Sequence, residues 1–136
     1  MHPLIRILRP ALAPTAAADV LAAAAICGGA PLERLLLGAG ASLCLYMGGM
    51  AQNDLADLER DKALHPDRPL PSQPSLVPKA RVLVFVLFAA GLGLGGAAGA
   101  FWPAVVVATF ASAYNLGLKQ IFPADVLSMG GARGAN

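Results

Sequence analysis

The chain has 136 residues, of which 57% are hydrophobic and only 13% are charged. This composition is more apolar than that of ordinary soluble domains, so we expect an all-α bundle of helices that spans the lipid bilayer several times. The formal net charge is only +2 and aromatic residues make up 6% of the chain, so the sequence gives no basis for binding nucleic acid.

The N-terminal segments predict an interfacial helix followed by a first span. Residues 1–10 carry Arg6 and Arg9 among apolar side chains, a pattern typical of a short helix at the membrane surface. Residues 11–29 are long enough to cross about 30 Å of hydrocarbon at roughly 1.5 Å per residue. Asp19 near their middle would be costly against lipid, so we expect it to face the bundle, as a contact between helices or with substrate.

The second predicted span, residues 35–52, is rich in glycine, alanine and serine, and such small residues let neighbouring helices pack closely. Cys27 and Cys44 lie in apolar runs and are expected to be small packing residues. An acidic segment, residues 53–71, follows directly after the second span. It contains five of the eight acidic residues of the chain: Asp54, Asp57, Glu59, Asp61 and Asp67.

The spacing of these acids indicates a function. If the helix of the second span continues, Asn53, Asp54, Asp57 and Asp61 lie along one face. Like charges on one face repel, but a divalent cation between them removes the repulsion. Hard oxygen ligands suit Mg²⁺, which commonly joins carboxylates to a substrate phosphate. A solvated helix end is the ordinary alternative, but the density and the one-sided spacing of the acids favour a metal site.

The segment after the acids and the later spans complete the predicted fold. Three prolines stiffen residues 65–71 and should hold Arg68 close to the acidic helix end. Residues 82–101 predict a third span whose glycine-rich second half should pack tightly against other helices. Residues 104–118 predict a fourth span, and residues 121–136 have the composition of a loop and the start of a fifth.

The sequence N-D-L-A-D-L-E-R-D at 53–61, followed by R-P-L-P-S at 68–72, resembles the first aspartate-rich motif of the UbiA family of membrane prenyltransferases. This resemblance implies an enzyme that moves a prenyl group from a prenyl diphosphate to an aromatic or other small acceptor. It implies Mg²⁺ as cofactor, held by Asn53 and three catalytic carboxylates: Asp54, Asp57 and Asp61.

The resemblance also implies that Asn53, Arg68, Tyr114 and Lys119 bind the diphosphate side of the substrate. Tyrosine and lysine at the end of a span are equally common as membrane anchors, so both interpretations of Tyr114 and Lys119 stay open. Four residues separate Tyr114 from Lys119 where the family pattern usually has three, which weakens the assignment of Tyr114 in particular.

The sequence departs from the family pattern at one more position. Leu58 stands where many family members have a basic residue, and Arg60 follows two positions later. In residues 121–136, Arg133 and Asn136 match polar residues that family members carry in their fifth span.

The family fold has more spans than the four and part of a fifth predicted here, and it has a second aspartate-rich motif. We therefore interpret residues 1–136 as the N-terminal portion of a UbiA-like domain. Three explanations stay open: a fragment of a longer product, a remnant without activity, or self-association in which each copy supplies one acidic motif. A membrane binding or scaffold protein without turnover is the alternative function.

Charge distribution predicts the topology. With a cytoplasmic N-terminus, the acidic segment lies on the cytoplasmic side, and Arg34 is the one basic residue expected on the opposite side within the predicted spans and loops. We therefore expect a multi-pass protein of the inner cell membrane. The basic residues predicted on the cytoplasmic side are Arg6, Arg9, Arg60, Lys62, Arg68, Lys79, Arg81 and Lys119.

Overall fold

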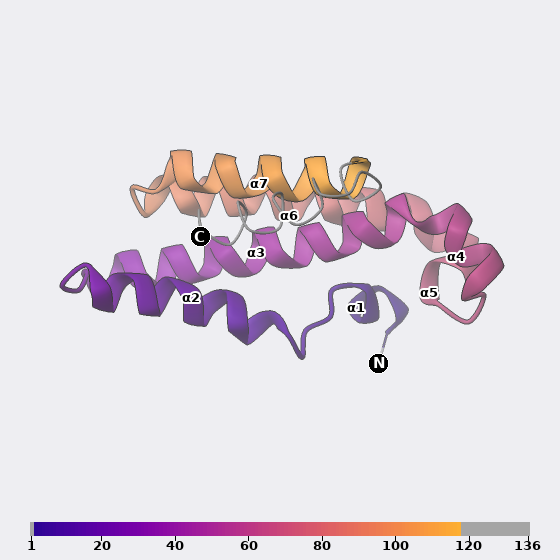
Figure 1. Ribbon diagram of the computed structural model, residues 1–136, viewed down its shortest axis with the longest axis horizontal. Coiled ribbons are helices and arrows are strands. Elements are labelled where there is room, and N and C mark those ends of the chain that lie inside the picture. Colours follow the sequence, from indigo (N-terminus) through magenta and orange to yellow (C-terminus); the bar gives the residue numbers. More distant parts are fainter. Residues whose placement is uncertain (1, 118–136) are drawn as a thin grey trace.

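The computed structural model describes residues 2–117, and within this range helices are the only regular secondary structure, with no strand (Figure 1). The all-α prediction is therefore confirmed for this part of the chain. Lys119 and the start of the fifth span lie outside the described residues. The helices are α1 (Pro3–Ile7), α2 (Ala13–Ile26), α3 (Leu32–Ala56), α4 (Leu58–Leu64), α5 (Pro69–Ser72), the short 3-10 helix η1 (Pro74–Leu76), α6 (Val77–Ala97) and α7 (Phe101–Leu116).

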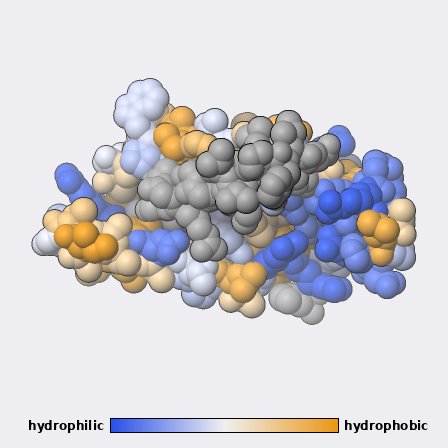
Figure 2. All heavy atoms as spheres, viewed as in Figure 1, coloured by the Kyte–Doolittle hydropathy of each residue, from blue (hydrophilic) through white to orange (hydrophobic). Residues whose placement is uncertain are grey.

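Helix α3 lies at the centre of an elongated bundle and packs against α2, α6 and α7. In Figure 1, α6 and α7 run side by side along one flank of α3, and α2 runs along the other. The short helices α4 and α5 lie together at the end where α3 finishes. Figure 2 shows that hydrophilic residues gather at this same end, so the bundle has an apolar body and one polar end.

Two glycines of α6 allow the helices to approach closely. A Cβ atom added at Gly91 would lie 2.7 Å from the Leu45 side chain of α3. A Cβ added at Gly95 would lie 2.7 Å from Cβ of Ala104 in α7. Both distances are below any normal contact, so the predicted tight packing of the glycine-rich half of this helix is confirmed, and it depends on residues without a side chain.

Helix lengths confirm the membrane prediction in part. Helix α3 and the helical run Pro74–Ala97 have 25 and 24 residues and are apolar enough to cross a membrane. Only 33% and 22% of their most apolar windows are buried inside the protein, unlike the core helices of soluble proteins. Helices α2 and α7 are also apolar but have 14 and 16 residues, shorter than the roughly 20 that a perpendicular span needs. The described residues thus provide two candidate spans, and the four-span arrangement stays a prediction.

The predicted N-terminal helix is present as α1, and it is anchored in the polar end of the bundle. Ile7 is 1% exposed and packs in a small core with Leu70 of α5, Leu76 of η1, Ala51 of α3 and Ala80 of α6. Since this core joins segments from both halves of the chain, it fixes the first residues of the protein beneath the end of α3.

The glycine contacts give a first prediction. Because Cβ of Ala104 is fixed to its backbone and cannot rotate away, Gly95→Ala must separate α6 from α7 and should destabilise the protein by about 1–3 kcal/mol. Unfolding in detergent micelles, followed by circular dichroism, measures this change. The matched control is Gly93→Ala on the same helix, where an added Cβ meets nothing within 4 Å and should stabilise the helix by up to about 1 kcal/mol. Equal effects of both substitutions would contradict the packing explanation.

Candidate active site

The acidic motif lies at a break between two helices. Helix α3 ends at Ala56, and Asp57 adopts φ −89° and ψ 2°, so α4 begins at Leu58 as a separate helix. The helix expected to continue through the motif is therefore interrupted at Asp57. Even so, the Asp57 amide donates to the Asn53 carbonyl at 3.0 Å, and the Asp61 amide donates to the Asp57 carbonyl at 2.8 Å. These bonds retain the helical spacing across the break.

The three motif aspartates on the two sides of this break are all removed from solvent. Asp54, Asp57 and Asp61 are all buried, and Asp61 is only 1% exposed. By contrast, the side chain of Glu59 is 83% exposed. The sequence prediction that the three aspartates share one face is consistent with this burial.

Each buried aspartate has its own arginine, and the three arginines come from different segments of the chain. Arg9 precedes α2 and lies 3.2 Å from Oδ1 of Asp54. Arg60 in α4 lies 3.0 Å from Oδ2 of Asp57. A buried carboxylate is costly unless it is paired with a cation, so these arginines make the burial of three acids tolerable. The third pair joins Asp61 and Arg68, with Nη1 of Arg68 2.5 Å from Oδ2 of Asp61.

The proline-rich segment holds Arg68 in place, as the sequence predicted. Helix α5 begins with Pro69, and the side chain of Leu70 is 1% exposed in the core beneath it. Arg68 is the N-cap residue of α5, and its guanidinium donates a hydrogen bond to the Asp61 carboxylate. The guanidinium is 39% exposed while the carboxylate is 1% exposed, so Arg68 bridges the buried acid and the surface.

One oxygen of this buried acid has no partner. Oδ1 of Asp61 is buried and has no hydrogen bond in the structure. A buried carboxylate oxygen without a donor costs about 1–3 kcal/mol, and such an atom is a suitable ligand for a hard cation. Among residues 2–117, however, no group of three or more His, Cys, Asp or Glu side chains lies close enough to hold a metal ion. The Mg²⁺ site predicted at Asn53, Asp54, Asp57 and Asp61 therefore stays a prediction.

Helix α7 is fixed to α3 directly beside the motif by a polar network that the sequence analysis missed. Asn115 is buried and donates to the Gly49 carbonyl at 2.9 Å and to Oε1 of Gln52 at 3.1 Å. Gln52 in turn donates to Oγ of Ser112 at 3.3 Å. Because Gln52 precedes Asn53, this network brings the last turn of α7, including the half-buried Tyr114, to the polar end of the bundle. An asparagine inside an otherwise apolar span was the available signal.

Arg9 and Arg60 also pair with motif aspartates, although the sequence did not indicate either as a site residue. From the sequence, Arg9 is a basic residue of an interfacial helix, and 45 positions separate it from Asp54. No local pattern reveals a contact across such a separation. Of the seven predicted site residues, the structure thus joins Asp54 to Arg9, Asp57 to Arg60 and Asp61 to Arg68. Asn53 is half-buried and directly precedes Asp54, and Tyr114 is half-buried and directly precedes Asn115. Lys119 lies outside the described residues.

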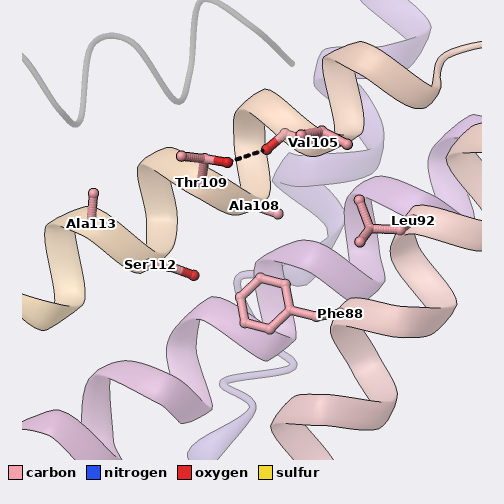
Figure 3. Close-up of a pocket in the computed structure, with 7 residues that line it drawn as sticks. All are labelled: Phe88, Leu92, Val105, Ala108, Thr109, Ser112 and Ala113. Carbon is pink, nitrogen blue, oxygen red and sulfur yellow. Dashed lines mark hydrogen bonds between the residues drawn. The ribbon is translucent and has the colours of Figure 1, made fainter.

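An apolar groove of about 450 Å³ lies between α6 and α7 (Figure 3). Phe88 of α6 and Ser112 of α7 point toward each other across it. The Thr109 hydroxyl donates a hydrogen bond to the Val105 carbonyl at 2.8 Å. Ser112 connects the groove to Gln52 and so to the polar end. The groove suits a hydrocarbon chain, and its lining residues are Phe88, Leu92, Val105, Ala108, Thr109, Ser112 and Ala113.

The architecture defines a class of protein: an apolar helical bundle with membrane-spanning character, whose polar end buries three paired aspartates. In a comparison with protein families, residues 11–135 match the UbiA prenyltransferase family, so the chain belongs to this family of membrane-embedded prenyltransferases. The resemblance recognised in the acidic motif is therefore confirmed. Searches of curated proteins and of solved structures found no match.

The Asp61–Arg68 pair gives a second prediction. Arg68→Ala leaves the buried Asp61 carboxylate without its cation and should lower the free energy of unfolding by about 1–3 kcal/mol, since the exposure of the guanidinium moderates the loss. Lys62→Ala is the control, because the Lys62–Glu59 pair is exposed and should contribute less than about 1 kcal/mol. Denaturation in micelles measures both. The pairing argument fails if the two variants are equally stable.

Proposed function

We propose that this protein transfers a prenyl group from a prenyl diphosphate to an aromatic or other small acceptor at the membrane. The proposal rests mainly on one observation: three buried aspartates at the polar end of an apolar bundle, one of which keeps an oxygen without a partner. In a UbiA family member, such a cluster has a direct use in binding the diphosphate.

In this proposal Asn53, Asp54, Asp57 and Asp61 hold Mg²⁺. All four side chains offer hard oxygen ligands, and the buried Oδ1 of Asp61 is available for a cation. Held by these residues, Mg²⁺ would supply positive charge against the diphosphate leaving group. Arg60 and Arg68 already counter two of the carboxylates and keep the motif folded before the metal binds.

In the same proposal, polar side chains of the protein bind the diphosphate, and apolar helix surfaces bind the prenyl chain. Arg68 is partly exposed, so its guanidinium can donate to diphosphate oxygens as the allylic carbon–oxygen bond breaks. Tyr114 and Lys119 bind the same side of the substrate. The prenyl chain lies along apolar helix surfaces such as the groove between α6 and α7, where the scarcity of water protects the allylic cation until the acceptor attacks and loses a proton.

The proposed setting is the inner cell membrane, with four spans and a cytoplasmic N-terminus. Helices α2 and α7 then cross the bilayer together with α3 and α6. The polar end holds α1, α4 and α5 at the cytoplasmic surface, where a water-soluble diphosphate group can reach the aspartates.

A second candidate function is a membrane binding or scaffold protein without turnover. The observation that favours it is the pairing of every motif aspartate with an arginine, because this network neutralises the acids without any metal. This alternative predicts that the acids serve stability alone.

Prenyl transfer by the purified protein in vesicles, with a radiolabelled prenyl diphosphate and a panel of aromatic acceptors, tests the two functions. We expect turnover that requires Mg²⁺ and falls about a hundredfold or more in Asp57→Asn and Asp61→Asn, because both variants remove a charged ligand. Glu59→Gln on the exposed face of α4 is the control and should keep full activity. If the aspartate variants retain the activity of the wild type, the enzymatic proposal is wrong. An absence of Mg²⁺-dependent turnover and of diphosphate binding in the wild type supports the scaffold alternative.

A further inference from the structure

The segment between α1 and α2 reaches the acidic motif through Arg9. Nη2 of Arg9 donates to Oδ1 of Asp54 at 3.2 Å. Arg9 has a backbone φ of 48°, and among residues 2–117 it is the only non-glycine residue with a positive φ. A side-chain-bearing residue in this left-handed region costs roughly 1 kcal/mol, so the surrounding structure must hold it there.

The anchoring of α1 explains how this backbone is held. Ile7, two residues earlier, is 1% exposed and packs against Leu70 and Ala51. Leu70 follows Arg68 in α5, and Ala51 lies one turn before Asp54 in α3. The core that fixes Ile7 is thus built on the same two helices that supply the acidic site, and Arg9 is carried at a fixed distance from Asp54.

The arginine is less confined than the acid it contacts. The side chain of Arg9 is 40% exposed, whereas that of Asp54 is 11% exposed. The Asp54 carboxylate is largely removed from water, so a nearby cation stabilises its charged form. Because the Arg9 side chain is 40% exposed, its guanidinium can also reach a ligand in the solvent beside Asp54.

A divalent cation and Arg9 would compete for the same carboxylate. Once a metal bound to Asp54, the guanidinium would lose its partner, and the nearest new acceptors would be the oxygens of a diphosphate held by that metal. A planar guanidinium matches phosphate oxygens in geometry and charge. The unpaired Oδ1 of Asp61, in the same motif, is a second carboxylate oxygen that a cation could use as a ligand.

We propose that Arg9 is the counter-ion of Asp54 in the absence of metal. When Mg²⁺ displaces Arg9 from Asp54, the Arg9 guanidinium binds the diphosphate instead. This inference rests on the proposed function. Its distinctive consequence is that Arg9 opposes the binding of Mg²⁺ alone but favours the binding of Mg²⁺ together with a diphosphate. A residue that served only to hold the fold would favour both.

The test is a pair of calorimetric titrations on the full chain in detergent micelles, one with Mg²⁺ alone and one with inorganic pyrophosphate at saturating Mg²⁺. In Arg9→Gln, Mg²⁺ alone should bind about fivefold more tightly, because the competing cation is lost. Pyrophosphate should bind about tenfold or more weakly, because a charged donor is lost. Arg9→Lys keeps the charge and should restore wild-type Mg²⁺ affinity with partial recovery of pyrophosphate binding.

The matched control is Arg6→Gln, which removes the same charge from an exposed position three residues earlier and should change neither titration by more than about twofold. If the affinities for Mg²⁺ and for pyrophosphate both fall in Arg9→Gln, or if neither changes, Arg9 does not exchange Asp54 for the diphosphate. The inference is then wrong, while the proposed function stands. If the wild type itself binds neither Mg²⁺ nor pyrophosphate, the proposed function fails and the inference fails with it.

Discussion

The structure depends on the pairing of buried carboxylates with arginines at one end of an apolar bundle. Charged groups removed from water must find a partner of opposite charge, and the cost of failing to do so is several kcal/mol per ion. Arg9, Arg60 and Arg68 meet this requirement from three separate segments. The pairing therefore joins the N-terminal segment, the helix break and the proline-rich segment into one polar end, which is where Figure 2 shows hydrophilic residues gathered.

Close helix packing brings these segments to the same place. Gly91 and Gly95 leave room on α6 for the side chains of Leu45 in α3 and Ala104 in α7. Asn115 fixes the end of α7 to α3 through two hydrogen bonds. Lipid does not drive helices together as water does, so small residues and polar contacts between helices must provide the association. The same contacts set the geometry of the polar end, because Gln52 directly precedes the acidic motif.

Membership of the UbiA family underlies the proposed diphosphate chemistry, and the arginines add a condition to that proposal. Acids that are neutralised by arginines need no metal for their burial, yet for the proposed metal to bind, each arginine would have to release or share its carboxylate. Arg9 is the best placed to do so, since it is partly exposed and its backbone is fixed by the core around Ile7. In this proposal, the ion pairs that stabilise the buried acids would also oppose the binding of a metal.

The sequence by itself determined the helical class, the apolar character, the family and the helical spacing of the three motif aspartates. These features follow from composition, local motif and helical period, which are properties of neighbouring residues. The proximity of Arg68 was also predictable, because prolines restrict a short connection. Only the tertiary structure decided the break at Asp57, the length of α2 and α7, and the contacts of Arg9 and Asn115. Those contacts join residues 45 and more positions apart, and the packing of several helices, rather than any local pattern, determines which of them meet.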